Sequence, residues 1–176
     1  MNKNEVYVFD DFLDNVEEIR EEALLLEYTK SLPDSGGWKG FRCLQGNVVT
    51  FELHEKIKDK LVKTSTMFDD CEMRCFFHYT LEEHNLGKEN IHRDHGFDYA
   101  GVLYLTPTPG ENSGTSFYND LGVETEYLEN IYNRLVIYPS NEWHSLKQAF
   151  GDNINNSRLT FTIFCKLKEK KTGSII

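Results

Sequence analysis

The second half of the chain is a succession of short apolar and aromatic runs, and this pattern constrains the fold more than any other feature. Loops rich in Gly, Pro, Asn and Ser separate the runs. Strand-length runs with this spacing are typical of two packed antiparallel sheets. The sequence therefore predicts a mainly β fold with flanking helices (α+β), arranged as a double-stranded β-helix, or jelly roll. The predicted strands are residues 73–81, 100–106, 115–118, 133–139, 143–148 and 158–167.

Helical patterns precede these strands. After a short predicted strand at residues 6–9, Asp14 followed by Glu17 indicates a helix N-terminus in a capping-box arrangement. Apolar residues then recur at helical spacing up to Leu26. A second helix is predicted over residues 54–67.

The length and charge of the chain limit its organisation and its partners. A chain of 176 residues suits one domain with a sizeable core. We expect a single domain over residues 1–176, with a helical part at about 1–70 and a jelly-roll core at about 71–168. The net charge of −10 argues against a general nucleic-acid binder, because phosphate binding requires a basic face.

Neither the N-terminus nor the cysteines indicate export or a membrane. The N-terminus lacks the apolar core of a signal peptide, and no stretch approaches the ~20 apolar residues of a spanning helix. The four cysteines form no CxxC pair and are expected to be reduced. We therefore predict a cytoplasmic protein without membrane or nucleic-acid partners, and the oligomeric state stays open.

The segment Ile91–Gly96, which reads IHRDHG, carries the first candidate functional residues. In extended backbone, His92 and Asp94 would point to the same side. Two ligands hold a metal weakly, and the best candidate for a third is His144, which lies fifty positions after Asp94 and follows a predicted strand. Two histidines and one carboxylate form the facial triad that suits Fe(II). The alternative is a polar turn that contains histidine by chance.

Arg158 opens the most regular strand pattern in the chain. In RLTFTIFCK, Arg158, Thr160 and Thr162 share one face, and the opposite face is apolar. A buried arginine requires an anionic partner. A carboxylate held by two hydrogen bonds, with a third from the hydroxyl of Thr160, would satisfy it. The alternative is an arginine at the solvent end of a strand, paired with a nearby Asp or Glu.

Taken in order, these motifs resemble those of the 2-oxoglutarate- and Fe(II)-dependent oxygenases, in particular the prolyl-4-hydroxylase-like branch. The resemblance covers about the C-terminal hundred residues. Its motifs are HRD, the strand-loop-strand stretch GVLYLTPTPGENSGTSFYN, the strand and turn NRLVIYPSNEWHS, and RLT. The resemblance implies that His92, Asp94 and His144 bind Fe(II).

The same resemblance implies a site for the cosubstrate 2-oxoglutarate. Arg158 and Thr160 would hold its distal carboxylate, and Tyr104 and Tyr79 are further candidates for hydrogen bonds to it. With O2, enzymes of this family hydroxylate a substrate and release succinate and CO2. Asp94 favours hydroxylation over halogenation, because halogenases of this superfamily lack that carboxylate.

Substrate-binding residues of such a fold would come from loops over the mouth of the cavity. In GGWKGFRC, Trp38 could stack on a substrate and Arg42 could bind an anion; the alternative is an ordinary connection with a buried Trp. In HGFDYAG, the candidates are Phe97 and Asp98. The sequence predicts a small-molecule or peptide substrate, which leaves a peptide, an amino acid and a small metabolite as possibilities.

Three functions are consistent with these motifs. The first is a 2-oxoglutarate-dependent dioxygenase acting as a hydroxylase. The second is a non-catalytic jelly-roll binding or structural module with an inherited metal site; loss of a ligand or of the arginine would favour it, and all four residues are present. The third is a metal-dependent hydrolase or isomerase of cupin type, which would have more histidine ligands and no use for Arg158.

Overall fold

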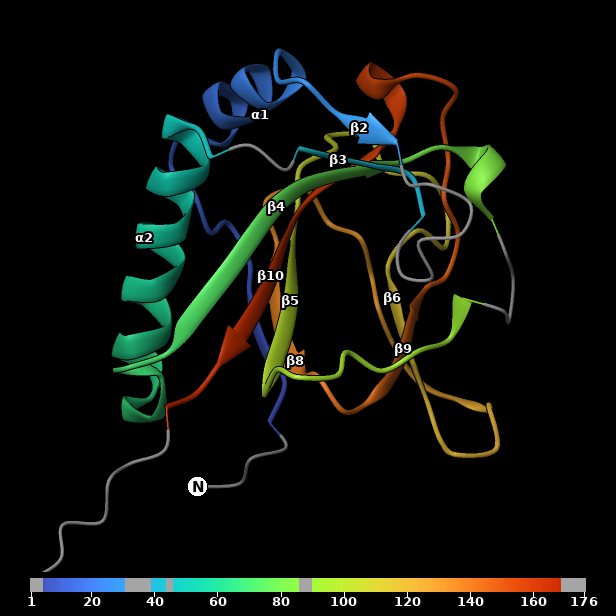
Figure 1. Cartoon of the computed structure of the whole chain (residues 1–176). Coiled ribbons are helices and arrows are strands. Elements are labelled where there is room, and N and C mark those ends of the chain that lie inside the picture. Colours follow the sequence, from blue (N-terminus) through green and yellow to red (C-terminus); the bar gives the residue numbers. More distant parts are fainter. Residues whose placement is uncertain (1–4, 31–38, 44–45, 86–89, 169–176) are drawn as a thin grey trace, which may run out of the picture.

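The computed structural model describes residues 5–30, 39–43, 46–85 and 90–168. Within these ranges the strands form two antiparallel sheets (Figure 1). The seven-stranded sheet has the order β1 (Tyr7–Phe9), β8 (Leu135–Pro139), β5 (Tyr99–Tyr104), β10 (Arg158–Lys166), β4 (Glu72–Thr80), β3 (Phe41–Cys43) and β2 (Thr29–Lys30). The three-stranded sheet has the order β7 (Glu124–Leu128), β6 (Thr115–Tyr118) and β9 (Trp143–Leu146). The prediction of a mainly β fold is thereby confirmed.

Two helices, α1 (Val16–Leu24) and α2 (Val48–Thr64), lie on the same side of the large sheet (Figure 1). Every fourth residue of α2 is buried, which places an apolar stripe toward the sheet. The main core combines this stripe with buried residues of α1 and of the sheet: Val49, Leu53, Ile57, Leu61, Ile19, Ala23, Phe77, Leu103 and Phe161. None of the described helices is long and apolar enough to cross a membrane. Short 3-10 turns occupy Thr66–Phe68, Glu82–His84 and Ile154–Asn156.

The predicted start of the second helix is wrong by six residues. The helix begins at Val48, where Asn47 caps it: the Asn47 side chain accepts a hydrogen bond of 2.8 Å from the backbone N–H of Thr50. The β-branched residues that follow Asn47 resemble a strand in the sequence. Burial of Val49 against the core and the cap outweigh that preference.

The first helix is also capped differently from the prediction. It begins at Val16, with Asn15 at the N-cap position, and no side chain caps it by a hydrogen bond. Asp14 therefore does not have the capping role that its spacing to Glu17 suggested. The helix ends at Leu24, two residues before the predicted end.

The six predicted strands from residue 73 onward all occur, and three short strands were not predicted. These are β2, β3 and β7. In β7 the first three residues are exposed and polar, so no apolar alternation marks the strand in the sequence. β3 matters for the site because it pairs with β4 at the wall of the cavity described below.

Alternate residues of β10 point to opposite sides of the large sheet. Leu159, Phe161, Ile163 and Cys165 belong to the core beneath the helices. The alternate residues Arg158, Thr162 and Phe164 line a cavity instead. Residues of the small sheet line the same cavity, so it lies between the two sheets.

Candidate metal centre

The segment that carries His92 and Asp94 is tied directly to β9. His92 and His144 form an isolated antiparallel bridge, in which the backbone N–H of each donates to the carbonyl of the other at 2.9 Å. The backbone N–H of Asp94 donates to the carbonyl of Ser140, also at 2.9 Å. Two segments that lie far apart in the sequence are therefore aligned by backbone hydrogen bonds.

This alignment brings the three predicted metal ligands together. Ligand atoms of His92, Asp94 and His144 lie within 4.8 Å of one another. The Nε2 atom of His92 is 3.7 Å from one carboxylate oxygen of Asp94, and that of His144 is 3.3 Å from the other. No further His, Cys, Asp or Glu of the described residues belongs to the group.

Each imidazole is held so that its Nε2 lone pair faces the carboxylate. The Nδ1–H of His92 donates to the carbonyl of Asn90 at 2.8 Å, and that of His144 donates to the carbonyl of Glu142 at 2.9 Å. A carbonyl only accepts, so Nδ1 carries the proton and Nε2 is free to bind a metal. Loss of solvent around the ring and the neighbouring His144 lower the pKa of His92, which favours the neutral ligand form, although 46 % of its side chain is exposed.

A cavity of about 120 Å³ joins this group to Arg158. Arg158 is 5 % exposed, and its Nε–H donates to the carbonyl of Ser113 at 2.7 Å. Its guanidinium lies over the ring of Tyr104, with 5.3 Å between them. Within the described residues, no Asp or Glu forms an ion pair with it. Burial lowers the pKa of Arg158, and Tyr104 and Tyr138 act in the opposite direction, so the cation persists without a carboxylate beside it.

Two other predicted cosubstrate residues lie behind the cavity wall. The hydroxyl of Tyr104 shares a hydrogen bond of 2.8 Å with that of Thr115, and the Tyr104 side chain is fully buried beneath Arg158. Thr160 is also fully buried, and its hydroxyl donates to the carbonyl of His78 at 3.2 Å. Neither is among the described residues that line the cavity, whereas Thr162 is.

The structure does not bring Tyr79 to the cavity. Its ring stacks on that of Phe41, with 4.6 Å between the centroids, and packs edge-on against Tyr28. Tyr79 belongs to the helix-covered side of the large sheet, because it alternates along β4 with His78, which lines the cavity. The role suggested for Tyr79 is therefore not retained.

The four predicted substrate residues have different positions. Arg42, on β3, lines the cavity, whereas Trp38 lies outside the described residues. Phe97 packs against Phe164 with 5.0 Å between the ring centroids. The Asp98 carboxylate accepts a hydrogen bond of 2.9 Å from the N–H of Leu167, and the backbone N–H of Asp98 donates to the carbonyl of Cys165 on β10, also at 2.9 Å. Phe97 and Asp98 are absent from the described lining of the cavity.

Among the described lining residues that sequence reasoning missed are His78 and Tyr138. The Tyr138 ring packs edge-on against His144, with 4.8 Å between the centroids, and burial raises its pKa. Tyr138 lies in β8, LVIYP, where polar and apolar residues do not alternate, so no face is marked in the sequence. In β4 the alternation does group His78 with polar residues, opposite an apolar face that includes Phe77 and Tyr79, and this signal could have placed His78 at the cavity. The regular alternation of β10 likewise groups Thr162 with Arg158.

Solved oxygenase structures resemble this chain over most of its length. A prolyl-4-hydroxylase from Pseudomonas putida has 14 % sequence identity and a TM-score of 0.63, covering 94 % of each chain. A Trichoplax adhaerens prolyl hydroxylase, in complex with a hypoxia inducible factor peptide fragment, has 12 % identity and a TM-score of 0.68, covering 93 % of this chain and 84 % of that chain. HygX from Streptomyces hygroscopicus, with nickel, 2-oxoglutarate and hygromycin B bound, has 11 % identity and a TM-score of 0.69, covering 94 % and 84 %.

This chain has the fold of the prolyl-4-hydroxylase-like oxygenases. The jelly-roll prediction is confirmed, and the likeness extends beyond the C-terminal hundred residues to the helical part. At these identities the likeness concerns the fold alone. No family model matches the sequence, and no curated protein matches it in sequence.

Proposed function

We propose that this protein is an Fe(II)- and 2-oxoglutarate-dependent dioxygenase that hydroxylates a small molecule or a peptide, with release of succinate and CO2. The observation that carries the proposal is the common cavity. It is lined both by the group His92, Asp94 and His144 and by Arg158, a buried cation without a carboxylate partner among the described residues. The oxygenase fold supports the same reaction class.

The residues present fit an Fe(II) ion. His92 and His144 would bind it through Nε2, and Asp94 through a carboxylate oxygen. None of the four cysteines, all in described residues, lines the cavity, so no thiolate favours zinc or copper. When bound, iron would supply the activation of O2 that hydroxylation requires, and the protein would supply binding and orientation.

The distal carboxylate of 2-oxoglutarate fits the position of Arg158. Its Nε–H is engaged by the Ser113 carbonyl, Tyr104 contacts the guanidinium, and no Asp or Glu of the described residues forms an ion pair with it, so a carboxylate of the cosubstrate would be its anionic partner. Tyr104 supports the guanidinium from the other side. Thr162 and Thr115 line the same cavity, and the Thr115 hydroxyl shares a hydrogen bond with that of Tyr104. Thr160 would act indirectly, through its hydrogen bond to β4.

The four free cysteines fit a reducing compartment, and we assign the protein to the cytoplasm on that basis.

The similar solved structures hold different ligands, a peptide fragment in one and hygromycin B in another. The fold therefore supports the reaction class, and the substrate has to be inferred from the cavity of this chain.

Anaerobic titration with Fe(II) and 2-oxoglutarate tests the proposal. We expect a visible charge-transfer band in the wild type and no band in His144→Ala, because a two-ligand site no longer holds the metal. Arg158→Met should still bind the metal, but it should require at least about tenfold more 2-oxoglutarate to develop the band, since it loses a charge-assisted carboxylate contact. Arg158→Lys should be intermediate.

The alternative, a non-catalytic module with an inherited metal site, makes a different prediction. Such a module would bind a metal without developing the band on addition of 2-oxoglutarate. Absence of the band from wild-type protein that binds the metal would therefore refute the oxygenase proposal and favour the module.

A further inference from the structure

We propose that Thr80 completes the anion site at Arg158 by donating a hydrogen bond to the distal carboxylate of 2-oxoglutarate. This inference rests on the proposed function and adds a residue to the same site. The sequence pattern of β10 suggested Thr160 as the source of this hydroxyl. The neighbouring strand β4 provides another hydroxyl, in a different environment.

Strand pairing places Thr80 beside Arg158. β4 and β10 lie side by side in the large sheet (Figure 1), and the two residues are direct partners across them. Directly opposite residues of an antiparallel pair have their side chains on the same face, with Cβ atoms about 4.5–5.5 Å apart. Both residues line the cavity, so Thr80 is adjacent to Arg158 on the cavity wall.

The hydroxyl of Thr80 has no hydrogen-bond partner among the described residues, although Thr80 is only 2 % exposed. Protein interiors leave few polar groups unpaired, because a buried hydroxyl without a partner has lost its hydrogen bonds to water without replacement. A carboxylate bound at Arg158 would provide the missing acceptor. A hydrogen bond to a charged acceptor is also among the stronger ones that a hydroxyl can make.

The hydroxyls of the other threonines near Arg158 are engaged or more distant. That of Thr160 donates to a backbone carbonyl of β4 at 3.2 Å, and that of Thr115 shares its hydrogen bond with a tyrosine. Thr162 lies four residues along β10 from Arg158, which corresponds to about 13 Å at the usual rise of a strand. Of these four threonines, Thr80 is the one that combines direct pairing with Arg158 and a hydroxyl without a described partner.

The chain before β3 packs closely against this end of β4. Gly40 has a φ of +92°, and a Cβ added to it would collide with the carbonyl oxygen of Tyr79 and lie 2.9 Å from Cγ2 of Thr80. Glycine adopts this backbone conformation without strain and leaves room for the contact. The methyl group of Thr80, and not its hydroxyl, therefore faces Gly40.

The experiment measures the affinity for 2-oxoglutarate rather than turnover. Fe(II)-loaded protein is titrated anaerobically with 2-oxoglutarate, and the charge-transfer band reports binding. Thr80→Val replaces the hydroxyl by a methyl group of similar volume. It should require about tenfold more 2-oxoglutarate than the wild type, because a hydrogen bond to a charged group is lost. Thr80→Ser keeps the hydroxyl and should stay within about threefold of the wild type.

A second ligand locates the contact. 2-Oxopentanoate has the same keto acid end and the same chain length as 2-oxoglutarate, but it has a methyl group in place of the distal carboxylate. The hydroxyl of Thr80 then has no anion to bind. The wild type and Thr80→Val should therefore bind 2-oxopentanoate with the same affinity, which a merely structural role of Thr80 would not predict.

The ligand-free protein gives an independent readout. Because an unpaired buried hydroxyl destabilises a fold, Thr80→Val should raise the melting temperature of the ligand-free protein, by roughly 2–4 °C. A lower melting temperature would mean that the hydroxyl supports the fold through a partner of its own.

Ser116→Ala is the matched control. It also removes one buried hydroxyl, from β6, but Ser116 is not among the described lining residues. Ser116 alternates along β6 with Thr115, which lines the cavity, and so belongs to the opposite face. The control should bind 2-oxoglutarate like the wild type.

Four outcomes overturn the inference: unchanged affinity of folded Thr80→Val for 2-oxoglutarate, an equal loss in Ser116→Ala, an equal loss for 2-oxopentanoate, or a lower melting temperature of ligand-free Thr80→Val. Any of these, with a charge-transfer band in the wild type, refutes the role of Thr80 and leaves the proposed function standing. Absence of the band from metal-loaded wild type refutes the proposed function itself, and the role of Thr80 with it.

Discussion

The two histidines of the candidate metal centre are oriented by their own chain neighbours. Each Nδ1–H donates to the carbonyl two residues earlier, that of Asn90 for His92 and that of Glu142 for His144. The tautomer of each ring is therefore set by local backbone rather than by a distant side chain. The ligand geometry depends on how the two segments meet, and Asp94 completes the group once they do.

His78 provides a residue-scale prediction about pH. Loss of solvent lowers its pKa to about 3; Arg42, Arg158 and His84 add to this effect, and a hydrogen bond to the carbonyl of Lys39 opposes it. In the unfolded chain the pKa is about 6.5. Below about pH 6.5 the unfolded chain binds a proton at His78 and the folded protein does not. The free energy of unfolding therefore decreases as the pH falls from 6.5 toward 3.

Urea unfolding at about pH 7.5 and about pH 5 checks this. Between these pH values the wild type should lose more stability than His78→Gln, by at most about 2 kcal/mol. Comparing the two proteins cancels the contribution of the carboxylates to the change in stability, because they titrate in both. Equal losses would show that His78 is not kept neutral by the fold.

At the scale of elements, short-range patterns located most strands but not every boundary. The start of α2 was missed because β-branched residues follow Asn47, yet a cap and an apolar stripe made that segment helical. β3 was missed because it is only three residues long and lies after a glycine-rich loop. Its pairing with β4 nevertheless determines that Arg42 reaches the cavity.

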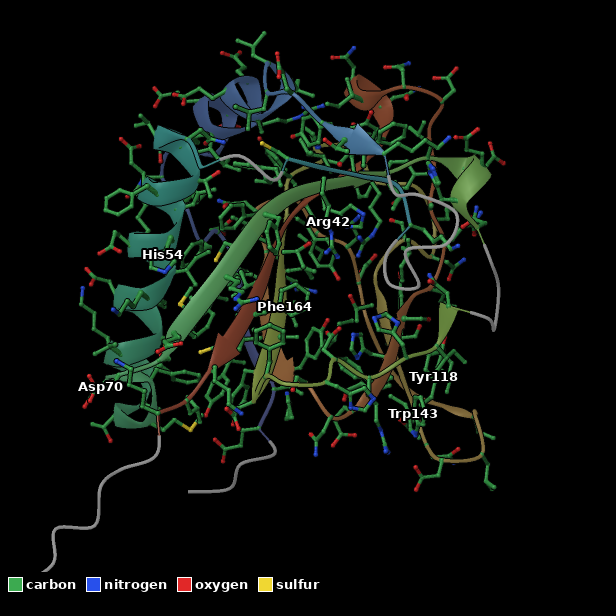
Figure 2. The ribbon with its side chains drawn as sticks, viewed as in Figure 1. Arg42, His54, Asp70, Tyr118, Trp143 and Phe164 are labelled. Carbon is green, nitrogen blue, oxygen red and sulfur yellow. The ribbon has the colours of Figure 1, made fainter. Side chains whose placement is uncertain are left out.

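A contact outside the cavity joins the two ligand-bearing segments. The carboxylate of Asp120 accepts hydrogen bonds of 2.9 Å both from Arg93, between His92 and Asp94, and from the Trp143 indole, next to His144. The Arg93 guanidinium also lies over the Trp143 ring, with 4.4 Å between them. Trp143 lies beside Tyr118, its partner on β6 (Figure 2).

We therefore expect Asp120→Ala to weaken metal binding. An exposed ion pair and one hydrogen bond contribute about 1 kcal/mol or less each, which corresponds to a fall in Zn(II) affinity of about three- to tenfold. Asp120→Asn should recover part of the affinity, because an amide oxygen still accepts both hydrogen bonds. Competition with a chromogenic chelator measures the affinity.

The control for Asp120 is Glu124→Ala. It removes another exposed ion pair of the small sheet, Glu124 to Lys147 at 2.9 Å, which does not join the ligand segments. A similar loss of affinity in this control would mean that general destabilisation, not positioning of the ligands, explains the effect.

At the scale of the whole molecule, the cavity connects the two sheets. The large sheet contributes Arg158 and Arg42, the small sheet contributes His144, and the connecting segment contributes His92 and Asp94. A ligand in this space contacts both sheets at once. Binding should therefore stabilise the molecule as a whole rather than one loop.

Thermal unfolding tests this expectation. Zn(II) with 2-oxoglutarate at about 100 times the dissociation constant should add about 2.7 kcal/mol, which raises the melting temperature by roughly 5–10 °C for a chain of this size. His144→Ala should show no such rise, and removal of the metal with a chelator should reverse it in the wild type. An equal rise in the variant would mean that the metal binds elsewhere.

The sequence by itself determined the strand-rich core, the two sides of β10 and the candidate residues His92, Asp94, His144 and Arg158. Local periodicity suffices for these, because a strand alternates with a period of two and a motif such as HxD is contiguous. In β4 the alternation separates Tyr79, on the apolar face, from His78, on the mostly polar face, but both faces of this sheet are covered, so alternation alone does not say which face meets the cavity. Only the tertiary structure decided which face of β4 meets the cavity. It also decided that His144 lies beside the HRD segment and that Arg42 lines the same cavity. These depend on pairings between residues far apart in the chain, which packing and loop closure select and no local pattern encodes.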